Sequence, residues 1–364
     1  MPGDPSLRVA LLKSWDFERW AQDHGAGAGL PYRIDHLQDH GIRLEWTDSV
    51  HSERWARSKL GSAVRRSEGR LVPYAQTLVL GRRIAASPAT LAMFESEANF
   101  LAALRRALPG RRSTVLAVIT CWLAELLIQG GKGRRAFYRQ AYQAVDRVYC
   151  FSASQAPLLQ EGLEVAPSRV RVIPFGVDAD RITPAGGEDG GYVLIVGRDR
   201  GRDWQTTFAA LGGLGAPVKV CARPSDVDGL RIPAGVEFLG YVARSRYEDL
   251  LRHASVVVVA TRQVAYPSGQ SVMLEAMAAG RAVVVSRTDA LHEYFDDGRT
   301  ALGVDVGDAD ALRAAISRAA GDADLRRRLG AAARSAVEER FNARAMWGLV
   351  AEDLHQLVAD RPRG

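Results

Sequence analysis

The chain has little of several features that mark particular classes of protein. Its 364 residues include only three cysteines, Cys121, Cys150 and Cys221, too few and too widely spaced for a disulfide framework or a zinc site. The longest apolar stretch, residues 114–127, contains Glu125 and is too short to span a bilayer. The N-terminus lacks an apolar run of signal-peptide length. We therefore expect a reduced, cytoplasmic protein.

Lysine is also scarce, because only four of the 48 basic residues are lysines. The formal net charge of +6 could indicate a nucleic acid or a membrane surface as partner. The arginines are scattered, however, so we expect no nucleic-acid partner. The basic segment 131–142, "GKGRRAFYRQAY", could contact an anionic membrane or an acceptor, although a solvated helix face is the favoured interpretation.

Short apolar runs alternate with longer segments of helical spacing throughout the chain. Such runs, without polar alternation, are typical of parallel strands that are covered on both faces. Segments such as 246–254 and 310–320 have helical spacing instead. The pattern predicts an α/β fold with binding sites at the carboxyl ends of the strands. The predicted strands cover residues 7–14, 114–120, 147–152, 192–197, 218–222, 255–260 and 282–286.

A change in composition divides the chain into two halves. The segment "DADRITPAGGEDGG", residues 178–191, is rich in Pro, Gly and acids and has no periodicity, as a linker does. We predict a first domain at 1–177 and a second at 192–343, with a cleft between them. A last long helix is expected over about residues 331–359, and its end, 344–364, is expected to pack back on the first domain.

The segment "SVVVVATRQVAYPSGQSVMLEAMAAG", residues 255–280, predicts a strand, a glycine loop and a helix. Gly269 lets a ligand approach the backbone, and the first N–H groups of the helix, at Gln270, Ser271 and Val272, form a ready anion site. Glu275 lies one turn deeper on the face of Ser271. Its carboxylate can accept hydrogen bonds from two vicinal hydroxyls, as acids do for a ribose. The segment therefore predicts a nucleotide site.

Four motifs in this order carry a family resemblance: "VYCFSASQAPLLQEG" followed by "VRVIPFGVD", then "YVLIVGRDRGRDWQTTFAAL", "VEFLGYV" with "YEDLLRHASVVVVATR", and "YPSGQSVMLEAMAAGRAVVVS". They resemble the retaining glycosyltransferases of family 4, over about residues 147–341. The resemblance implies the two-domain GT-B fold, with two Rossmann-like domains. The first 145 residues match only loosely, as expected of the half that binds the acceptor.

The resemblance also implies roles for particular residues. Glu275 matches the acid that holds the donor ribose, and the backbone from Gly269 to Val272 matches the diphosphate loop. Arg198 matches the basic residue that neutralises the leaving diphosphate. Arg202 is the nearest substitute for a lysine that usually follows it, and its fork suits phosphate oxygens. The nucleobase is expected near Tyr241 and Val242, with Arg223 nearby.

One position departs from the family pattern, because Pro267 stands where an acid usually contacts the donor sugar. Ser268 or Gln270 could hold the sugar instead, the sugar could be a deoxy or amino sugar, or catalysis could have been lost. In the first half, Trp122 and Glu125 follow a predicted strand as sugar or acceptor candidates; a buried Trp beside a solvated Glu is the alternative. The glycine loop 23–31, with Gly27 and the possible base His24, could line the donor phosphates.

Together these features predict an enzyme that moves a sugar from a nucleoside diphosphate sugar to a hydroxyl acceptor, a natural product or a cell-envelope glycan or lipid. The resemblance implies retention at the anomeric carbon. Beyond the sugar nucleotide as co-substrate we expect no cofactor and no metal, because the "DAD" acids at 178, 308 and 322 lie in the linker or at helix starts. A sugar-nucleotide 2-epimerase and a non-catalytic, transferase-derived partner protein are the alternatives. The acceptor and the oligomeric state stay open.

Overall fold

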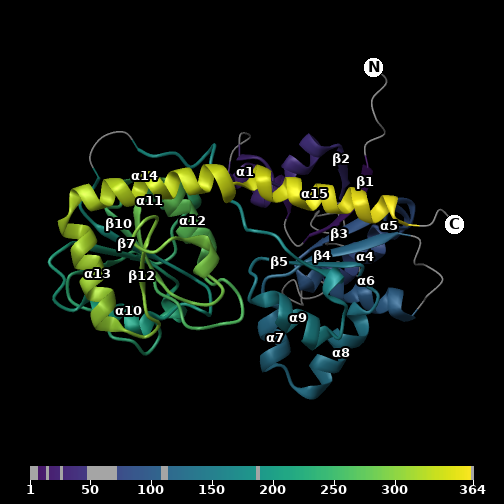
Figure 1. The fold of residues 1–364 in the computed structure, drawn as a ribbon, viewed down its shortest axis with the longest axis horizontal. Coiled ribbons are helices and arrows are strands. Elements are labelled where there is room, and N and C mark those ends of the chain that lie inside the picture. The colour runs from purple at the N-terminus through teal and green to yellow at the C-terminus, as the bar shows by residue number, and fades with distance from the viewer. Residues whose placement is uncertain are drawn as a thin grey trace. The chain divides into compact units, whose positions relative to one another are not determined.

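The structure is a computed structural model, and it describes residues 7–13, 16–24, 28–46, 72–107, 114–185 and 189–361. The chain forms two compact units. The first comprises Met1–Ile173 and Met346–Gly364, and the second comprises Pro174–Ala345. Each unit is an α/β structure built on one parallel sheet, so the predicted fold class is confirmed (Figure 1).

The first unit contains a six-stranded parallel sheet in the order β2-β1-β3-β4-β5-β6. Its central strands are apolar and almost completely buried, which is why they read as unbroken apolar runs. The strands are β1 Leu7–Leu12, β2 Ile42–Glu45, β3 Ala89–Met93, β4 Val115–Ile119, β5 Arg147–Cys150 and β6 Val170–Val172. The helices are α1 Phe17–His24, η2 Pro31–His40, α4 Val72–Val79, α5 Gly81–Ala86, α6 Glu95–Ala107, α7 Leu123–Gln129, α8 Lys132–Tyr142, α9 Gln155–Leu163 and η5 Pro167–Arg169.

The second unit contains a six-stranded parallel sheet in the order β12-β11-β10-β7-β8-β9. The valines of β10 and β11 are fully buried and form the centre of its core. The strands are β7 Val193–Val196, β8 Val218–Cys221, β9 Val236–Phe238, β10 Val256–Val259, β11 Ala282–Ser286 and β12 Leu302–Val304. The helices are α10 Trp204–Leu211, η6 Pro224–Asp226, α11 Arg244–His253, α12 Gln270–Ala278, η7 His292–Tyr294, α13 Ala309–Gly321 and α14 Ala323–Arg340.

The segment expected as a linker belongs to the second unit as far as the structure describes it. Asp189 in this segment accepts a hydrogen bond from Nε of Arg326 at 3.1 Å, and it also pairs with the hydroxyl of Ser255. The two units are instead divided between Ile173 and Pro174 and between Ala345 and Met346.

The single helix expected over residues 331–359 is wrong, because the structure has two helices there. Helix α14 ends at Arg340, and α15 covers Ala343–Ala359. Phe341 and Asn342 leave the helical pattern to pair with the backbone of Val177, and the Asn342 side chain accepts a hydrogen bond from Ala345 N at 2.8 Å. This capping bond starts a new helix, as Asn does at helix N-termini.

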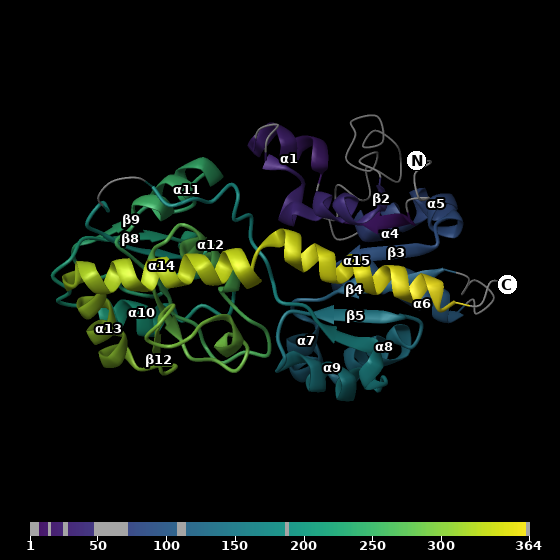
Figure 2. The same ribbon diagram turned by 45° about the horizontal axis from the view of Figure 1, so that its top comes forward.

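Helix α15 lies alongside the other elements of the first unit (Figure 2), and one buried acid anchors it there. Asp353 is almost fully buried and accepts hydrogen bonds from Arg147 Nε at 2.7 Å, from Arg171 Nη1 at 2.6 Å and from the Tyr149 hydroxyl at 2.8 Å. Near its other end, Trp347 donates its indole N–H to the carbonyl of Tyr32 at 2.7 Å. These contacts tie the end of the chain to the strands and to η2 of the first unit.

Candidate functional site

The strand order of the second sheet reverses between β7 and β10. In open α/β sheets, ligands bind outside the carboxyl ends of the strands at such a reversal. The loops that follow these two strands are joined by main-chain hydrogen bonds, from Asp203 N to Ala260 O at 3.1 Å and from Arg262 N to Gly201 O at 2.8 Å. The loop that carries Arg202 is therefore fixed directly at this reversal.

Arg202 is the most unusual side chain at this position. It is only 7% exposed, and its Nη2 donates a hydrogen bond to the carbonyl of Val196 at 2.5 Å. Among the residues that the structure describes, its buried Nε has no hydrogen-bond partner. Burial lowers the pKa of the guanidinium to about 10, although nearby Asp199 acts in the opposite direction. At neutral pH the group is therefore a buried cation with unused hydrogen-bonding capacity.

The start of α12 lies against this cation. Gly269, the residue before the helix, has a φ of 82°, a left-handed conformation that glycine adopts without strain. A Cβ atom at Gly269 would lie only 2.8 Å from Nη1 of Arg202, so the guanidinium packs against the glycine backbone. Gly269 provides no side-chain cap for the helix, and the N–H of Gln270 already donates to the carbonyl of Pro267 at 3.1 Å. The helix N-terminus and Arg202 thus present positive charge side by side, which favours an anionic ligand.

In this region, three buried polar atoms have no hydrogen-bond partner within the described part of the chain. They are Nε of Arg202, Oγ1 of Thr261 and Oε1 of Gln270. Arg202 and Thr261 form a bridge in the backbone, and Gln270 directly follows Gly269 in the first turn of α12. Because buried polar groups are nearly always paired, a cluster of unpaired ones requires an explanation, such as a ligand that completes them.

Asp199 holds the loop before α12 in place. Its carboxylate accepts hydrogen bonds from the Tyr266 hydroxyl at 2.9 Å, from the Ser268 hydroxyl and from Gly201 N at 3.2 Å. Pro267 is buried between the two side-chain donors. The hydroxyl of Ser268, a predicted sugar contact, is therefore already engaged by Asp199.

Glu275 lies one and a half turns into α12, and helix α11 holds its carboxylate. Arg244 donates from Nη2 to Oε1 at 2.8 Å, and the Tyr247 hydroxyl donates to Oε2 at 2.5 Å. Burial alone would lower the pKa of Arg244, but Glu275 and Glu248 together raise it above its ordinary value. Burial and the neighbouring Glu275 raise the pKa of Tyr247, so its hydroxyl stays a donor. The side chain of Glu275 thus has a fixed orientation.

Arg198, Arg223 and Tyr241 form a second, exposed group in this unit. The guanidinium carbon of Arg198 lies 5.1 Å from the centre of the Tyr241 ring, which is 66% exposed. Nη2 of Arg223 donates to the carbonyl of Arg198 at 3.0 Å, and the same side chain pairs with Asp226. The structure therefore brings Tyr241 and Arg223, two residues expected near the nucleobase, together with Arg198, which was expected at the diphosphate. Val242, the residue after Tyr241, is half-buried.

Two predicted residues of the helix start differ in exposure. Ser271 is exposed in the first turn of α12, whereas Val272 is half-buried.

The candidates from the first half of the chain lie in the first unit. Trp122 is 42% exposed and precedes α7, so the expected alternative of a buried tryptophan is wrong. Glu125, in the first turn of α7, accepts a hydrogen bond from the Gln129 side chain. His24 is the last residue of α1. Gly27 lies outside the described residues.

The sequence did not single out Asp199, Arg244 or Tyr247. Asp199 follows Arg198 directly in "GRDRGRD", and an acid within a basic loop is a weak signal for a loop anchor. Arg244 and Tyr247 are three residues apart and therefore share one face of α11. That spacing could have suggested a joint role, but only the packing of α11 on α12 shows that their partner is Glu275.

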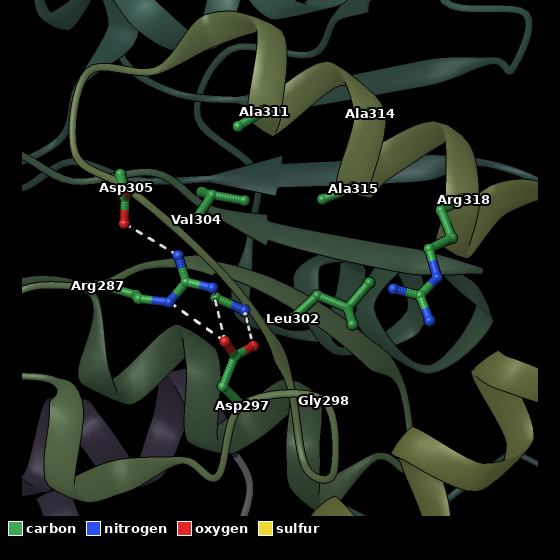
Figure 3. A pocket seen from close by; sticks show the side chains of 11 residues that line it. Arg287, Asp297, Gly298, Leu302, Val304, Asp305, Ala311, Ala314, Ala315 and Arg318 are labelled. Carbon is green, nitrogen blue, oxygen red and sulfur yellow. Dashed lines mark hydrogen bonds and ion pairs between the residues drawn. The ribbon is translucent and has the colours of Figure 1, made fainter.

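The structure also contains a cavity of about 500 Å³ beside β12 and α13 (Figure 3). Arg287, at its edge, is paired with Asp297 at 2.6 Å and Asp305 at 2.9 Å, whereas Arg318 lies apart from these three (Figure 3). The cavity lies at the β12 edge of the sheet, two strands away from the reversal of strand order between β10 and β7. We place the candidate site at the reversal of strand order. Two carboxylates already neutralise Arg287, whereas the charge of the buried Arg202 is neutralised much less completely.

Two general findings bear on the site. In the described ranges, no three His, Cys, Asp or Glu side chains are grouped so that they could hold a metal ion. The helices of those ranges include none with the length and apolar character needed to cross a membrane.

Two family models match separate parts of the chain. The model described as "Glycosyltransferase Family 4" matches residues 45–181, and the model "Glycosyl transferases group 1" matches residues 195–322. A D-inositol 3-phosphate glycosyltransferase from Corynebacterium jeikeium is 27% identical over 284 residues, 68% of this chain. That match spans 65% of the relative, slightly less than two thirds of its length.

Solved structures of similar fold cover nearly the whole chain. Sucrose-phosphate synthase from Thermosynechococcus elongatus has a TM-score of 0.71 at 18% identity, covering 97% of this chain and all of that one. Anabaena HepE in complex with UDP and glucose has a TM-score of 0.68 at 14% identity, covering 96% of this chain and all of that one. At these identities the likeness concerns the fold.

Proposed function

This chain belongs to the family 4 glycosyltransferases and has their GT-B fold, and on that premise we propose that it transfers a sugar from a nucleoside diphosphate sugar to a hydroxyl group of an acceptor. The donor binds at the carboxyl ends of β7 and β10. The similar HepE structure contains UDP and glucose, so a uridine nucleotide is the first donor to test.

The observation that carries the proposal is the buried, incompletely bonded cation Arg202 beside the uncapped start of α12. A diphosphate carries negative charge and many acceptor oxygens, which match the unused donors of Arg202 and the N–H groups of the helix start. Thr261 lies next to Arg202, and its hydroxyl can donate to a phosphate oxygen as well.

The nucleoside half of the donor is assigned to two neighbouring groups. Glu275 accepts hydrogen bonds from the ribose hydroxyls; each carboxylate oxygen has two acceptor positions, so Arg244 and Tyr247 can stay bound at the same time. The exposed ring of Tyr241, with Arg198 against it, offers a face for the nucleobase.

The charge of Arg202 is most valuable during the reaction itself. As the bond between the anomeric carbon and the phosphate oxygen breaks, the nucleoside diphosphate leaves with the electron pair and gains negative charge. A cation already fixed in a buried position stabilises this charge without reorganisation. The acceptor oxygen bonds to the anomeric carbon, and its proton passes to the departing phosphate. Attack on the same face, which puts the two oxygens side by side, gives the proposed retention.

A thermal-shift screen with UDP, GDP, ADP and dTDP, followed by a transfer and hydrolysis assay, tests the proposal. A ligand that binds only the folded state raises its apparent stability. We expect one nucleotide to raise the melting temperature of the wild type and to lose this effect in Arg202→Ala. Arg299→Ala, which removes an exposed arginine of the same unit, is the matched control. The proposal is wrong if no nucleotide stabilises the protein, or if the donor is isomerised rather than cleaved.

The donor sugar is a finer part of the same proposal. Pro267 offers no hydrogen bond to a sugar hydroxyl from its side chain, and the Ser268 hydroxyl is engaged by Asp199. A buried hydroxyl without a partner costs about 1–3 kcal/mol, so we propose that the enzyme prefers a deoxy or amino sugar; the competing account is that Gln270, whose buried Oε1 has no partner among the described residues, holds the hydroxyl instead. Competition between matched donors tests this preference, and a clear preference for UDP-glucose or UDP-N-acetylglucosamine over deoxy-sugar and free amino-sugar donors would refute it.

A further inference from the structure

Three aromatic side chains of the first unit form a connected group. The ring centres of Tyr32 and Phe94 lie 5.9 Å apart in an edge-to-face arrangement, and those of Phe94 and Trp122 lie 5.5 Å apart. Phe94 is half-buried between its neighbours, whereas Tyr32 is 39% and Trp122 42% exposed. Large aromatic side chains contribute most to stability when they are buried. A connected aromatic group with two exposed members is therefore a candidate surface for binding a ligand. We call these three residues the aromatic platform.

The backbone under the platform has an uncommon conformation. Tyr32 has a φ of 55° and Phe94 a φ of 78°, in the left-handed region that residues with a side chain rarely adopt. In the described residues, only Arg33 and Glu164 share this feature among the non-glycine positions. Such conformations cost on the order of 1–3 kcal/mol each and concentrate at functional sites. Two of the platform residues are thus held in orientations that a relaxed loop would not adopt.

Surrounding contacts maintain these orientations. The carbonyl of Tyr32 accepts the indole N–H of Trp347 at 2.7 Å. Asp35 accepts hydrogen bonds from Leu30 N at 2.8 Å and from Arg33 Nε at 3.2 Å, which closes the turn around Tyr32. The rigid turn keeps the ring of Tyr32 exposed beside Phe94.

Glu95 fixes the other end of the platform. It directly follows Phe94 and is almost fully buried. Its carboxylate accepts hydrogen bonds from the Thr120 hydroxyl at 3.0 Å, from Cys121 N at 3.3 Å and from Trp122 N at 3.2 Å. One buried acid therefore ties the segment after β3 to the segment after β4, and with it Phe94 to Trp122.

The platform lies where this sheet is expected to bind a ligand. The strand order of the first sheet reverses between β1 and β3, and Phe94 directly follows the carboxyl end of β3. Trp122 follows the carboxyl end of the neighbouring strand β4. One and two turns after Trp122, α7 carries Glu125 and Gln129, a carboxylate and an amide that bond to each other.

We propose that the aromatic platform is the acceptor subsite and that it binds a sugar or cyclic polyol ring; this inference rests on the proposed glycosyl transfer. The C–H groups on one face of such a ring are apolar and pack on aromatic faces. Its hydroxyls lie around the rim and require hydrogen-bonding groups such as Glu125 and Gln129. A flexible alkyl chain would make no use of rings whose orientation is fixed.

Saturation-transfer NMR on the full-length protein tests the subsite. The probes are methyl α-D-glucopyranoside and myo-inositol, with D-sorbitol as an open-chain polyol that has no ring face. We expect saturation to reach the ring probes and not sorbitol. Trp122→Ala should weaken binding of the ring probes about five- to tenfold, and Trp122→Phe should restore part of it. Phe137→Ala, which removes a 44% exposed aromatic ring on α8, is the matched control and should bind as the wild type does.

The shift in melting temperature with UDP, measured on the same samples, separates this inference from the proposed function. Equal UDP stabilisation of wild type and Trp122→Ala, together with loss of the ring probes, supports the subsite. The subsite is refuted if Trp122→Ala binds the ring probes as well as the wild type does, if sorbitol is saturated equally, or if no ring probe is saturated. Failure of UDP to stabilise the wild type would instead count against the donor site.

Discussion

Arg244 and Glu275 form an ion pair between two helices, with 2.8 Å between Nη2 and Oε1. Tyr247, one turn further along α11, donates its hydroxyl to the other oxygen of the same carboxylate. A glutamate on a free helix face would sample several rotamers, whereas this one is held from two sides. We infer that α11 sets the orientation of Glu275 before any nucleotide binds.

Replacing Glu275 by Gln should weaken UDP binding about tenfold or more, because a neutral amide accepts weaker hydrogen bonds than a carboxylate. Titration calorimetry with UDP measures the change, and circular dichroism checks the fold. Asp249→Asn, which alters an exposed acid of α11 paired with Arg246, should bind UDP normally. An unchanged affinity in folded Glu275→Gln would remove Glu275 from the site.

Arg202→Ala should lower turnover at saturating donor by about 100-fold or more, the usual effect of deleting a preorganised group that stabilises developing charge. Binding of uridine, which lacks phosphates, should change little. Lysine at this position should restore only part of the rate. The Arg202 guanidinium donates to the Val196 carbonyl and keeps other N–H groups for a ligand, whereas a single ammonium cannot do both in the same geometry. Steady-state kinetics and uridine titration provide the comparison.

Arg200→Ala serves as the control for Arg202, because Arg200 is an exposed arginine of the same loop. Its loss should leave turnover near normal. Arg198 could reach the diphosphate from its place beside Tyr241, as the family resemblance implies; in that role Arg198→Ala should lower turnover more than it weakens uridine binding. A near-normal rate for Arg202→Ala at saturating donor would contradict the role assigned to this residue.

Gly269→Ala should destabilise the protein and weaken UDP binding together. The added Cβ would lie 2.6 Å from Cγ1 of Val259 and 2.8 Å from Nη1 of Arg202, and the residue would keep its φ of 82°. Gly298→Ala isolates the backbone effect, because Gly298 has a φ of 73° and its Cβ would meet no atom within 4 Å. We expect about 1–2 kcal/mol lost at Gly298, a larger loss at Gly269, and reduced UDP affinity only at Gly269. Urea denaturation and UDP titration measure both; equal behaviour of the two variants would contradict the tight packing at Gly269.

The sequence alone predicted the α/β class because the central strands are unbroken apolar runs. Of the described strands that it missed, all but β3 are edge strands, whose burial is partial: β9 has no buried residue, and β6 has one. Strand β3, "ATLAM", is fully buried, but its alanines have low strand propensity. Partial exposure and weak propensity both remove the apolar signal.

The sequence also predicted only part of the candidate site. The loop and helix with Gly269 and Glu275 have a recognisable local pattern, so the sequence is sufficient there. Arg244 and Tyr247 lie on a helix whose many charged residues look like a solvated face. Their pairing with Glu275 joins positions about thirty residues apart, and no local periodicity records such a contact. The aromatic platform likewise combines residues from three separate segments.

The buried acid Glu97 should contribute a loss of stability as the pH rises from about 4.5 to 7. Burial raises the pKa of Glu97 to about 7; nearby Glu95 adds to this effect, and the Ser96 hydroxyl, 2.6 Å away, opposes it. In the unfolded chain Glu97 ionises near pH 4.5, whereas in the folded protein it keeps its proton up to about pH 7. Between pH 4.5 and 7, each increase in pH therefore lowers the free energy of unfolding further, and above pH 7 this loss of stability is constant. Glu97→Gln removes the penalty, so it should raise the free energy of unfolding above pH 7 by about 1–3 kcal/mol relative to the wild type and should have little effect below pH 4.5.

Urea denaturation between pH 4 and 8, followed by tryptophan fluorescence, measures the difference. Glu161→Gln, at an exposed position of α9, should track the wild type throughout, and a Glu97→Gln curve parallel to that of the wild type would show that Glu97 has the same pKa in the folded protein as in the unfolded chain.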